Sequence, residues 1–204
     1  MFLVGLTGNF GMGKSTVLKM FQRLGAVTYD ADEIVAALLM EETVRERIRD
    51  LLGNDVFLGD GSLDKNRVAS IVFADGALRR ALEDILHPLV FKKIQSFLDR
   101  AGKRSRLVIV EVPLLFERSY EDRFQRIITI QAEQDRTLER LEAKGISRAD
   151  ALLRISSQLP IIEKIGKSDF IIYNDGTLEE TEQQVREIYE KLLHEDDDGD
   201  RRRS

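Results

Sequence analysis

One stretch near the start of the chain reads Gly8-Asn9-Phe10-Gly11-Met12-Gly13-Lys14-Ser15 and matches the pattern G-x-x-x-x-G-K-[ST] at every fixed position. Glycines in such a loop let backbone N–H groups converge on phosphate, the lysine reaches the β- and γ-phosphates, and the serine hydroxyl coordinates Mg²⁺. We therefore predict that a nucleoside triphosphate and Mg²⁺ bind here, with Ser15 as the metal ligand. The candidate nucleotide-binding residues in this stretch are Gly8, Gly11, Met12, Gly13, Lys14, Ser15 and Thr16.

The sequence on both sides of this loop supplies the elements that would position it. An apolar run from Phe2 to Leu6 predicts a first strand, and it runs straight into the loop without the basic segment of a signal peptide. Val17, Leu18 and Phe21 recur at helical spacing, which predicts a helix over residues 14–24. A strand, a glycine-rich turn and a helix in this order point the positive end of the helix at a bound phosphate.

Further polar residues follow the other predicted strands, which cover residues 26–29, 107–112, 127–130 and 169–173. Strands that alternate with helices predict an α/β fold, here a five-stranded parallel sheet of P-loop NTPase type flanked by helices. Ligands in such sheets bind beyond the carboxyl ends of the strands. The polar residues expected there are Asp30, Asp32, Glu111 and Asn174, and Asn174 is a further candidate for nucleotide contact.

The expected organisation is a single domain over residues 1–193, followed by a charged, disordered tail over residues 194–204. A long helical stretch interrupts the strand–helix rhythm and predicts a helical insertion that binds the acceptor. Within it, a proline after His87 predicts a break between two helices, 76–86 and 89–101. Two arginine-rich helices around Gly145 predict a lid, and the last helix is expected over residues 178–193. The parts are the core at about 1–40, 104–132 and 160–193, the insertion at 41–103 and the lid at 133–159.

Composition limits the classes of protein to consider. The 204 residues are 43% hydrophobic and 33% charged, with a net charge of −5, which favours a soluble enzyme without a dedicated nucleic-acid surface. The chain has no cysteine, so disulfides and thiolate chemistry are excluded. No apolar run is long enough to cross a bilayer. We expect a cytoplasmic protein, a monomer or weak homo-oligomer, that binds small molecules and neither nucleic acid nor membrane.

Three reactions of a nucleoside triphosphate compete at this stage. A GTPase switch needs an Asn-Lys-x-Asp guanine reader, which the chain lacks. A motor ATPase usually ends its third strand with Asp-Glu, whereas here Glu111 is followed by Val112 and Pro113. Phosphoryl transfer to a small acceptor needs a pocket, a carboxylate near the attacking hydroxyl and a cationic lid, and the sequence offers a candidate for each.

The carboxylate and the lid cations each have a structural alternative. Asp32 is not needed to cap the helix that follows it, because Asp30 can do so, and this leaves Asp32 as the candidate base. Arg136 and Arg140 lie four residues apart, on one helical face, from which both can reach a triphosphate. The alternative is a solvated helix in which neighbouring glutamates, such as Glu139, pair with these arginines.

Together, several motifs resemble the dephospho-CoA kinase family over about residues 2–193. Asp-Ala-Asp after the second strand, combined with His-Pro and Pro-Leu-Leu-Phe-Glu, is the specific part of this resemblance. The matching residues are Gly5-Leu6-Thr7-Gly8, Gly11, Gly13-Lys14-Ser15-Thr16-Val17, Asp30-Ala31-Asp32, Leu86-His87-Pro88, Val112-Pro113-Leu114-Leu115-Phe116-Glu117, Arg154-Ile155, Gln158, Pro160, Asp169-Phe170-Ile171-Ile172, Asn174 and Gly176.

The resemblance implies ATP-dependent phosphorylation of the ribose 3′-hydroxyl of dephospho-CoA, the last step of coenzyme A synthesis. By position, Asp32 resembles the family's catalytic carboxylate, Arg140 its lid arginine and His87 part of its acceptor pocket. The candidate catalytic residues are therefore Asp32, Lys14 and Arg140. A histidine before a proline is otherwise more often a packed residue. The other candidate acceptor-binding residues are Glu111, Pro113, Leu114 and Phe116.

The chain departs from the family pattern at two places. Asn9, Phe10 and Met12 replace Gly, Ile and Ser in the usual loop Gly-Gly-Ile-Gly-Ser-Gly-Lys. Glu111 stands where the family usually has Asp, and its role toward acceptor or metal is open. The alternative functions are another P-loop kinase for a nucleoside or small molecule, and a nucleotide-binding regulatory protein that has lost transfer, which the intact candidate catalytic residues disfavour.

Overall fold

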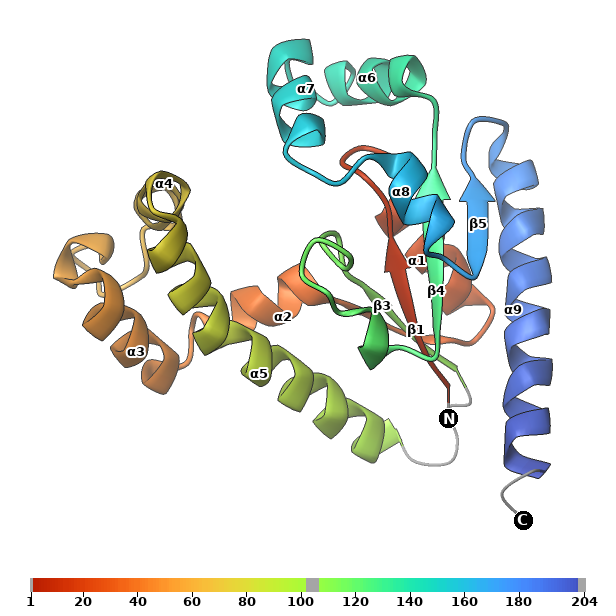
Figure 1. Ribbon diagram of the computed structural model, residues 1–204, viewed down its shortest axis with the longest axis horizontal. Helices are drawn as coiled ribbons and strands as arrows, with labels where there is room; N and C mark the ends of the chain where they lie inside the picture. Colours follow the sequence, from red (N-terminus) through yellow and green to blue (C-terminus); the bar gives the residue numbers. More distant parts are fainter. Residues whose placement is uncertain (1, 102–106, 202–204) are drawn as a thin grey trace. The chain divides into compact units, whose positions relative to one another are not determined.

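The computed structural model describes residues 2–101 and 107–201. The chain divides into two compact units. The first unit comprises residues 1–30 and 103–204 and contains the sheet, whereas the second comprises residues 31–102 and is mainly helical (Figure 1). Each unit has its own hydrophobic core.

The first unit is built on a five-stranded sheet in the order β2-β3-β1-β4-β5, with every neighbouring pair parallel. This confirms the predicted fold class. The middle strands are buried on both faces, as their continuous apolar runs require. The strands are β1 (Phe2–Thr7), β2 (Val27–Asp30), β3 (Leu107–Glu111), β4 (Arg126–Gln131) and β5 (Phe170–Tyr173).

Two long helices, α1 (Lys14–Arg23) and α9 (Leu178–Arg201), pack on each other and on the sheet. Their shared core includes Phe21 and Leu192, both fully buried. A short helix, α8 (Ile161–Gly166), packs against β4, and Figure 1 shows it in front of that strand. The sequence does not predict α8, because six residues carry too little periodicity to distinguish a helix.

The segment predicted to be a lid, called the lid below, folds into α6 (Gln134–Glu142) and α7 (Arg148–Ser156), close to the predicted pair of helices. Gly145 turns the chain between them with a φ of 82°, and the Ser147 hydroxyl accepts a hydrogen bond from the Asp150 N–H to cap α7. The buried residues of α6 and α7 form a cluster of their own, with Leu138, Leu141 and Ala151 at its centre.

The second unit contains α2 (Ala31–Leu38), α3 (Glu42–Leu52), α4 (Lys65–Ala74) and α5 (Gly76–Ala101), with a 3₁₀ turn at Asn54–Val56. Since α2 packs against α5, it belongs with this helical unit, although the sequence places residues 31–40 with the core. The Asp64 carboxylate caps α4 by accepting from two backbone N–H groups.

The predicted break at His87-Pro88 is wrong, because α5 is one helix that contains Pro88. A proline removes one helical hydrogen bond and crowds the carbonyl four residues earlier, a cost of about 3 kcal/mol. Contacts of α5 with α2, α3 and α4 oppose that local cost, and the buried Leu86, Val90 and Ile94 lie on both sides of the proline. Tertiary packing therefore overrides the local preference.

The last helix also differs from its predicted end at residue 193. It continues to Arg201, through most of the segment expected to be disordered, whereas 202–204 lie outside the described residues. Arg126 pairs with Glu195 at 2.9 Å, and adding a turn to an existing helix avoids the cost of nucleation. None of the helices in the described part of the chain is long and apolar enough to cross a membrane.

Candidate active site

The predicted phosphate loop joins β1 to α1 and adopts a conformation that requires glycine. Gly11 and Gly13 have φ angles of 83° and 95°, in the left-handed region that other residues rarely adopt. A Cβ atom at Gly11 would lie 2.6 Å from Leu141 Cδ1, and one at Gly13 would collide with the Asn174 side chain. The two glycines thus permit both the turn and its close packing.

The amino end of α1 opens onto this loop. Gly13 is the N-cap and provides no side-chain hydrogen bond, so the cap leaves the N-terminal N–H groups of the helix for a ligand. Ser15 and Thr16 are exposed in the first turn, and Lys14 Nζ donates to the Asn9 carbonyl at 3.2 Å. A glycine cradle at an uncapped helix start, with a lysine beside it, fits a triphosphate.

Asn174, which follows β5, contacts the loop directly. Its Nδ2 donates to the Met12 carbonyl at 2.9 Å, and its Oδ1 accepts from the Thr181 hydroxyl at 3.1 Å. Both ends of the amide are therefore engaged, and the side chain braces the loop. Its predicted contact with nucleotide stays a prediction.

The segment after β3 carries several of the candidate acceptor residues. Glu111 is 5% exposed at the end of β3, where it pairs in register with Leu6 of β1 and Asp30 of β2. Phe116 is buried, and Pro113 and Leu114 are partly buried. The sheet thus brings Glu111 and the phosphate loop to the same edge.

A buried lysine that sequence reasoning missed anchors this segment. Lys164 of α8 is fully buried and pairs with Glu117 Oε1 at 2.8 Å. Its Nζ also donates to the Pro113 carbonyl at 3.1 Å. Burial lowers the pKa of Lys164 below its ordinary value, although the hydrogen bond and charge of Glu117 partly oppose this shift. The sequence carries no clear signal for this lysine, because the six residues of α8 are too few to be recognised as a packed helix.

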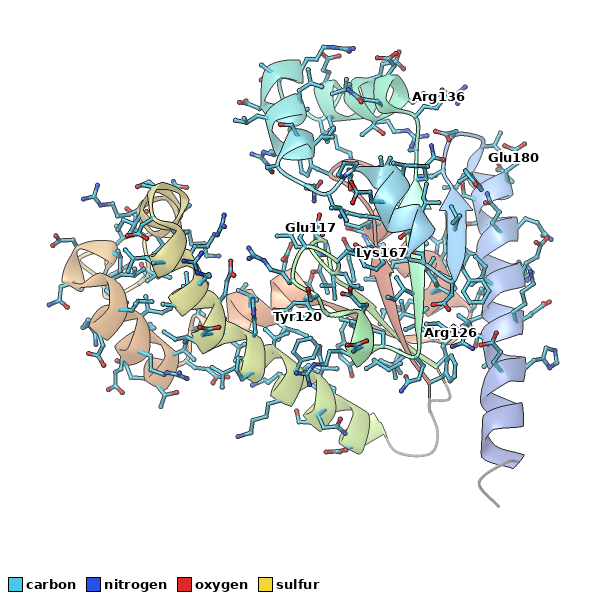
Figure 2. All side chains as sticks on the ribbon, in the orientation of Figure 1. Glu117, Tyr120, Arg126, Arg136, Lys167 and Glu180 are labelled. Atoms are coloured by element: carbon cyan, nitrogen blue, oxygen red, sulfur yellow. The ribbon has the colours of Figure 1, made fainter. Side chains whose placement is uncertain are left out.

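The two candidate lid arginines have different surroundings. Arg136 Nη1 donates to the carbonyl of Asp175, the residue that follows Asn174. Arg136 Nε lies 3.8 Å from Glu133 Oε2. Figure 2 shows Arg136 on the first turn of α6. Arg140 is half-exposed and makes no hydrogen bond or ion pair with any described residue. The predicted pairing with glutamate thus holds for Arg136 and not for Arg140.

Two segments join the lid to the rest of its unit: the β4–α6 connection and the α7–α8 connection. The α7–α8 connection makes three hydrogen bonds to the core. Gln158 Oε1 accepts from the Phe10 N–H at 2.7 Å, and the Leu159 carbonyl accepts from Asn9 Nδ2 at 3.2 Å. The Leu159 N–H donates to Glu117 Oε1 at 2.9 Å. This segment therefore contacts both the phosphate loop and the loop after β3.

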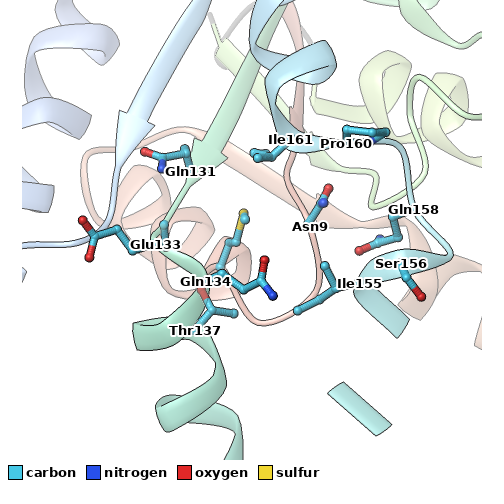
Figure 3. Close-up of a pocket in the computed structure, with 12 residues that line it drawn as sticks. Asn9, Gln131, Glu133, Gln134, Thr137, Ile155, Ser156, Gln158, Pro160 and Ile161 are labelled. Carbon is cyan, nitrogen blue, oxygen red and sulfur yellow. The ribbon is translucent and has the colours of Figure 1, made fainter. Parts of the chain in front are cut away.

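A cavity of about 430 Å³ lies between the two connections of the lid (Figure 3). Most of its lining is apolar, and Met12 is the one candidate nucleotide residue in its wall. The labelled side chains in Figure 3 come from the phosphate loop, from the end of β4 and the start of α6, and from the end of α7 through the start of α8.

Asp32 and His87 belong to the second unit. Asp32 is exposed in the first turn of α2, two residues after the end of β2. His87 is partly buried in α5, directly before Pro88. Among the described residues, no group of three or more His, Asp or Glu side chains is placed to hold a metal ion. A hydroxyl such as that of Ser15, together with phosphate oxygens and water, is the donor set that Mg²⁺ uses beside a nucleotide.

Comparisons with known proteins agree over nearly the whole chain. A model of the dephospho-CoA kinase family matches residues 2–180. Dephospho-CoA kinase from Aquifex aeolicus is 35% identical over 193 residues, covering 94% of this chain and 98% of the relative. The enzyme of the same name from Geobacter metallireducens is 36% identical over 196 residues, covering 95% and 98%.

Two solved structures are similar in fold. TT1252 from Thermus thermophilus has a TM-score of 0.84 and 32% identity, covering 94% of this chain and 97% of the other. Dephospho-CoA kinase from Campylobacter jejuni has a TM-score of 0.69 and 26% identity, with the same coverage. This chain therefore belongs to the dephospho-CoA kinase family.

Proposed function

We propose that this protein transfers the γ-phosphoryl group of ATP to the ribose 3′-hydroxyl of dephospho-CoA, giving coenzyme A and ADP. One observation carries the proposal: an intact phosphate loop lies within a chain that matches the dephospho-CoA kinase family over residues 2–180. The loop accounts for the phosphoryl donor, and family membership accounts for the acceptor.

The phosphate loop binds the donor. Backbone N–H groups from Gly11 to Ser15 surround the β- and γ-phosphates, and Lys14 offsets their charge. Ser15 would hold Mg²⁺ through its hydroxyl, and the metal would supply positive charge that offsets the negative charge of the phosphates. Arg136 and Asn174 contribute to the nucleotide side of the site, and Arg136 is already held at the Asp175 carbonyl.

Asp32 orients the attacking hydroxyl and accepts its proton. The new bond joins the ribose 3′-oxygen to the γ-phosphorus, the bond from that phosphorus to the β–γ bridging oxygen breaks, and the electron pair leaves with ADP. Arg140 stabilises the charge on the transferred group, and its lack of a partner among the described residues leaves its guanidinium available. Such an arginine contributes roughly 10³–10⁵ in rate.

The acceptor contacts His87, Glu111 and the loop after β3. Pro113, Leu114 and Phe116 supply an apolar surface, and Lys164 fixes this loop through the Pro113 carbonyl. Glu111 faces either the acceptor or the metal, since its carboxylate suits both. We further propose a cytoplasmic enzyme, a monomer or weak homo-oligomer, that acts only on small molecules, in line with its net charge of −5.

An acceptor panel tests this function. ADP release is measured with dephospho-CoA beside adenosine, nucleoside monophosphates and shikimate at equal concentration. We expect kcat/KM for dephospho-CoA to exceed the others by roughly 10² or more, because acceptor discrimination depends on groups that pair only with the correct substrate. If dephospho-CoA is no better than the other acceptors, the assignment is wrong.

A further inference from the structure

We propose that Asn9 and Phe10 are positioning residues that fasten the lid to the phosphate loop, so that triphosphate binding in the loop is coupled to the position of the lid. The pattern that defines the loop leaves both positions variable, because backbone groups and Lys14 bind the phosphates. The inference rests on the proposed function only for ATP as the ligand of the loop, so it can be tested without the acceptor.

The ring of Phe10 belongs to the lid cluster. It packs against a group centred on Leu138, Leu141 and Ala151, to which Ile146 and Ile155 also belong. At the neighbouring Gly11, an added Cβ would lie 2.6 Å from Leu141 Cδ1 and 2.8 Å from Thr137 Cγ2. The loop backbone thus lies directly against α6, and Phe10 is the loop's apolar contribution to the lid.

Two hydrogen bonds fasten the other end of the lid to the same loop residues. The Phe10 N–H donates to Gln158 Oε1 at 2.7 Å, so this N–H group binds the segment that follows α7. Asn9 Nδ2 donates to the Leu159 carbonyl at 3.2 Å, and Asn9 is only 3% exposed. A partly buried polar group that loses its hydrogen-bond partner is left without water to replace it, so these contacts resist separation.

Leu159 is fixed from its other side as well. Its N–H donates to Glu117 Oε1, and Glu117 in turn pairs with the buried Lys164. Both backbone polar groups of Leu159 are therefore bound, one to the loop after β3 and one to the phosphate loop. The segment 157–160 thus connects Asn9 and Phe10 to the end of α7 at Ser156, and it is held at the loop after β3 as well.

A charged contact reinforces the attachment. The guanidinium carbon of Arg154, on α7, lies 5.0 Å from the centre of the Phe10 ring, within the range of a cation–π interaction. Arg154 is itself exposed. The contact therefore holds an arginine of the lid next to the phosphate loop, and an aliphatic residue at position 10 would pack without this attraction.

The test compares four single variants and one double variant in the full chain. Phe10→Ala removes the ring, Arg154→Met removes the cation while keeping the stem, and Phe10→Tyr keeps the ring face as a conservative replacement. Leu153→Ala is the matched control, because Leu153 lies on α7, is 70% exposed and is outside the lid cluster. Circular dichroism and thermal unfolding verify that each variant folds.

ATP binding is measured by calorimetry without acceptor, and hydrogen exchange of residues 134–156 is measured with and without ATP. For Phe10→Ala we expect the Kd for ATP to rise roughly tenfold and ATP-dependent protection of the lid to be lost. Arg154→Met should raise the Kd roughly two- to fivefold. Phe10→Tyr and Leu153→Ala should stay within twofold of the parent.

The double variant Phe10→Ala/Arg154→Met should bind ATP as Phe10→Ala does, because Phe10→Ala already removes the ring with which Arg154 makes its cation–π interaction. Parent-like ATP affinity and lid protection in Phe10→Ala would overturn the proposal. If Phe10→Ala does not fold, an unchanged Kd in Arg154→Met overturns it instead. A parent protein that shows the Phe10-dependent lid response yet does not phosphorylate dephospho-CoA would refute the proposed function and leave this inference standing.

Discussion

At the scale of single residues, the candidate catalytic groups differ in how far the position of the side chain indicates its chemical role. Lys14 and Ser15 are placed by the turn at Gly13 and the start of α1, an arrangement that follows from the residue types alone. Asp32 is exposed at the start of α2 and needs the acceptor to define its role. Its assignment is therefore best tested by chemistry.

Replacing Asp32 by Asn should separate binding from turnover. Asparagine keeps the size of the side chain and loses the ability to accept the hydroxyl proton. We expect kcat to fall by roughly 10² or more while ATP affinity stays within a few fold. Steady-state kinetics with dephospho-CoA and calorimetry with ATP measure the two quantities. Near-parental turnover would show that Asp32 is not the base.

The position of a residue in the fold could be predicted from the sequence where a motif dictates the backbone geometry, and not where tertiary contacts decide. The glycines, Lys14 and Ser15 could be placed in advance, because phosphate binding needs these residue types at these spacings. The bracing role of Asn174 and the attachment of Phe10 to the lid could not, since both depend on segments far along the chain that meet only in the folded protein.

At the scale of elements, the short helix α8 stabilises the loop after β3. Lys164 joins α8 to Glu117 and to the Pro113 carbonyl, and Glu117 also accepts from Leu159. Figure 2 shows Glu117 on that loop. A buried lysine with a lowered pKa is often sought as a catalytic base, but here the geometry assigns it to structure, because its ammonium group is used by an ion pair and a carbonyl.

Replacing Lys164 by Met should lower the free energy of unfolding at pH 7 by about 1–3 kcal/mol, because the Glu117 carboxylate and the Pro113 carbonyl then lose their buried hydrogen-bond donor. Adding Glu117→Gln to this variant should restore part of the loss, because the remaining charge is removed. Urea denaturation of the parent, both single variants and the double variant measures the coupling. Additive effects of the two replacements would contradict a structural ion pair.

The same lysine gives a pH dependence of defined sign. Because the folded state lowers the pKa of Lys164, it binds fewer protons than the unfolded chain between that lowered pKa and the ordinary value of 10.5. The contribution of Lys164 to the free energy of unfolding therefore rises with pH across this window and falls as pH drops through the folded-state pKa. Lys164→Met should lack this rise when the two unfolding curves are compared.

The continuous helix α5 shows the limit of local rules at this scale. A proline is a sound signal for a helix end, and the sequence predicts two helices around Pro88. Apolar residues on both sides of it, such as Leu86 and Val90, bury against neighbouring helices and keep the helix intact. Propensity is a difference of a few kcal/mol, which a packed face can outweigh.

At the scale of the whole molecule, the candidate site residues are divided between two units. The phosphate loop, Glu111 and the lid belong to the unit with the sheet, whereas Asp32 and His87 belong to the helical unit of residues 31–102. The strand–helix alternation predicts the parallel sheet, because crossover connections leave few other arrangements. The start of the helical unit could not be predicted from the sequence, because the packing of α2 on α5 cannot be deduced from either helix alone.

The most direct test of the central claim is to locate the transferred phosphate. The protein is incubated with ATP, Mg²⁺ and dephospho-CoA, and the product is identified by mass and by phosphorus NMR, with an acceptor analogue that lacks the ribose 3′-hydroxyl as control. The account predicts one ADP for each coenzyme A formed, with the new phosphate on the 3′-oxygen and no turnover of the analogue. Phosphate at another position, or ADP released without a phosphorylated acceptor, would contradict it.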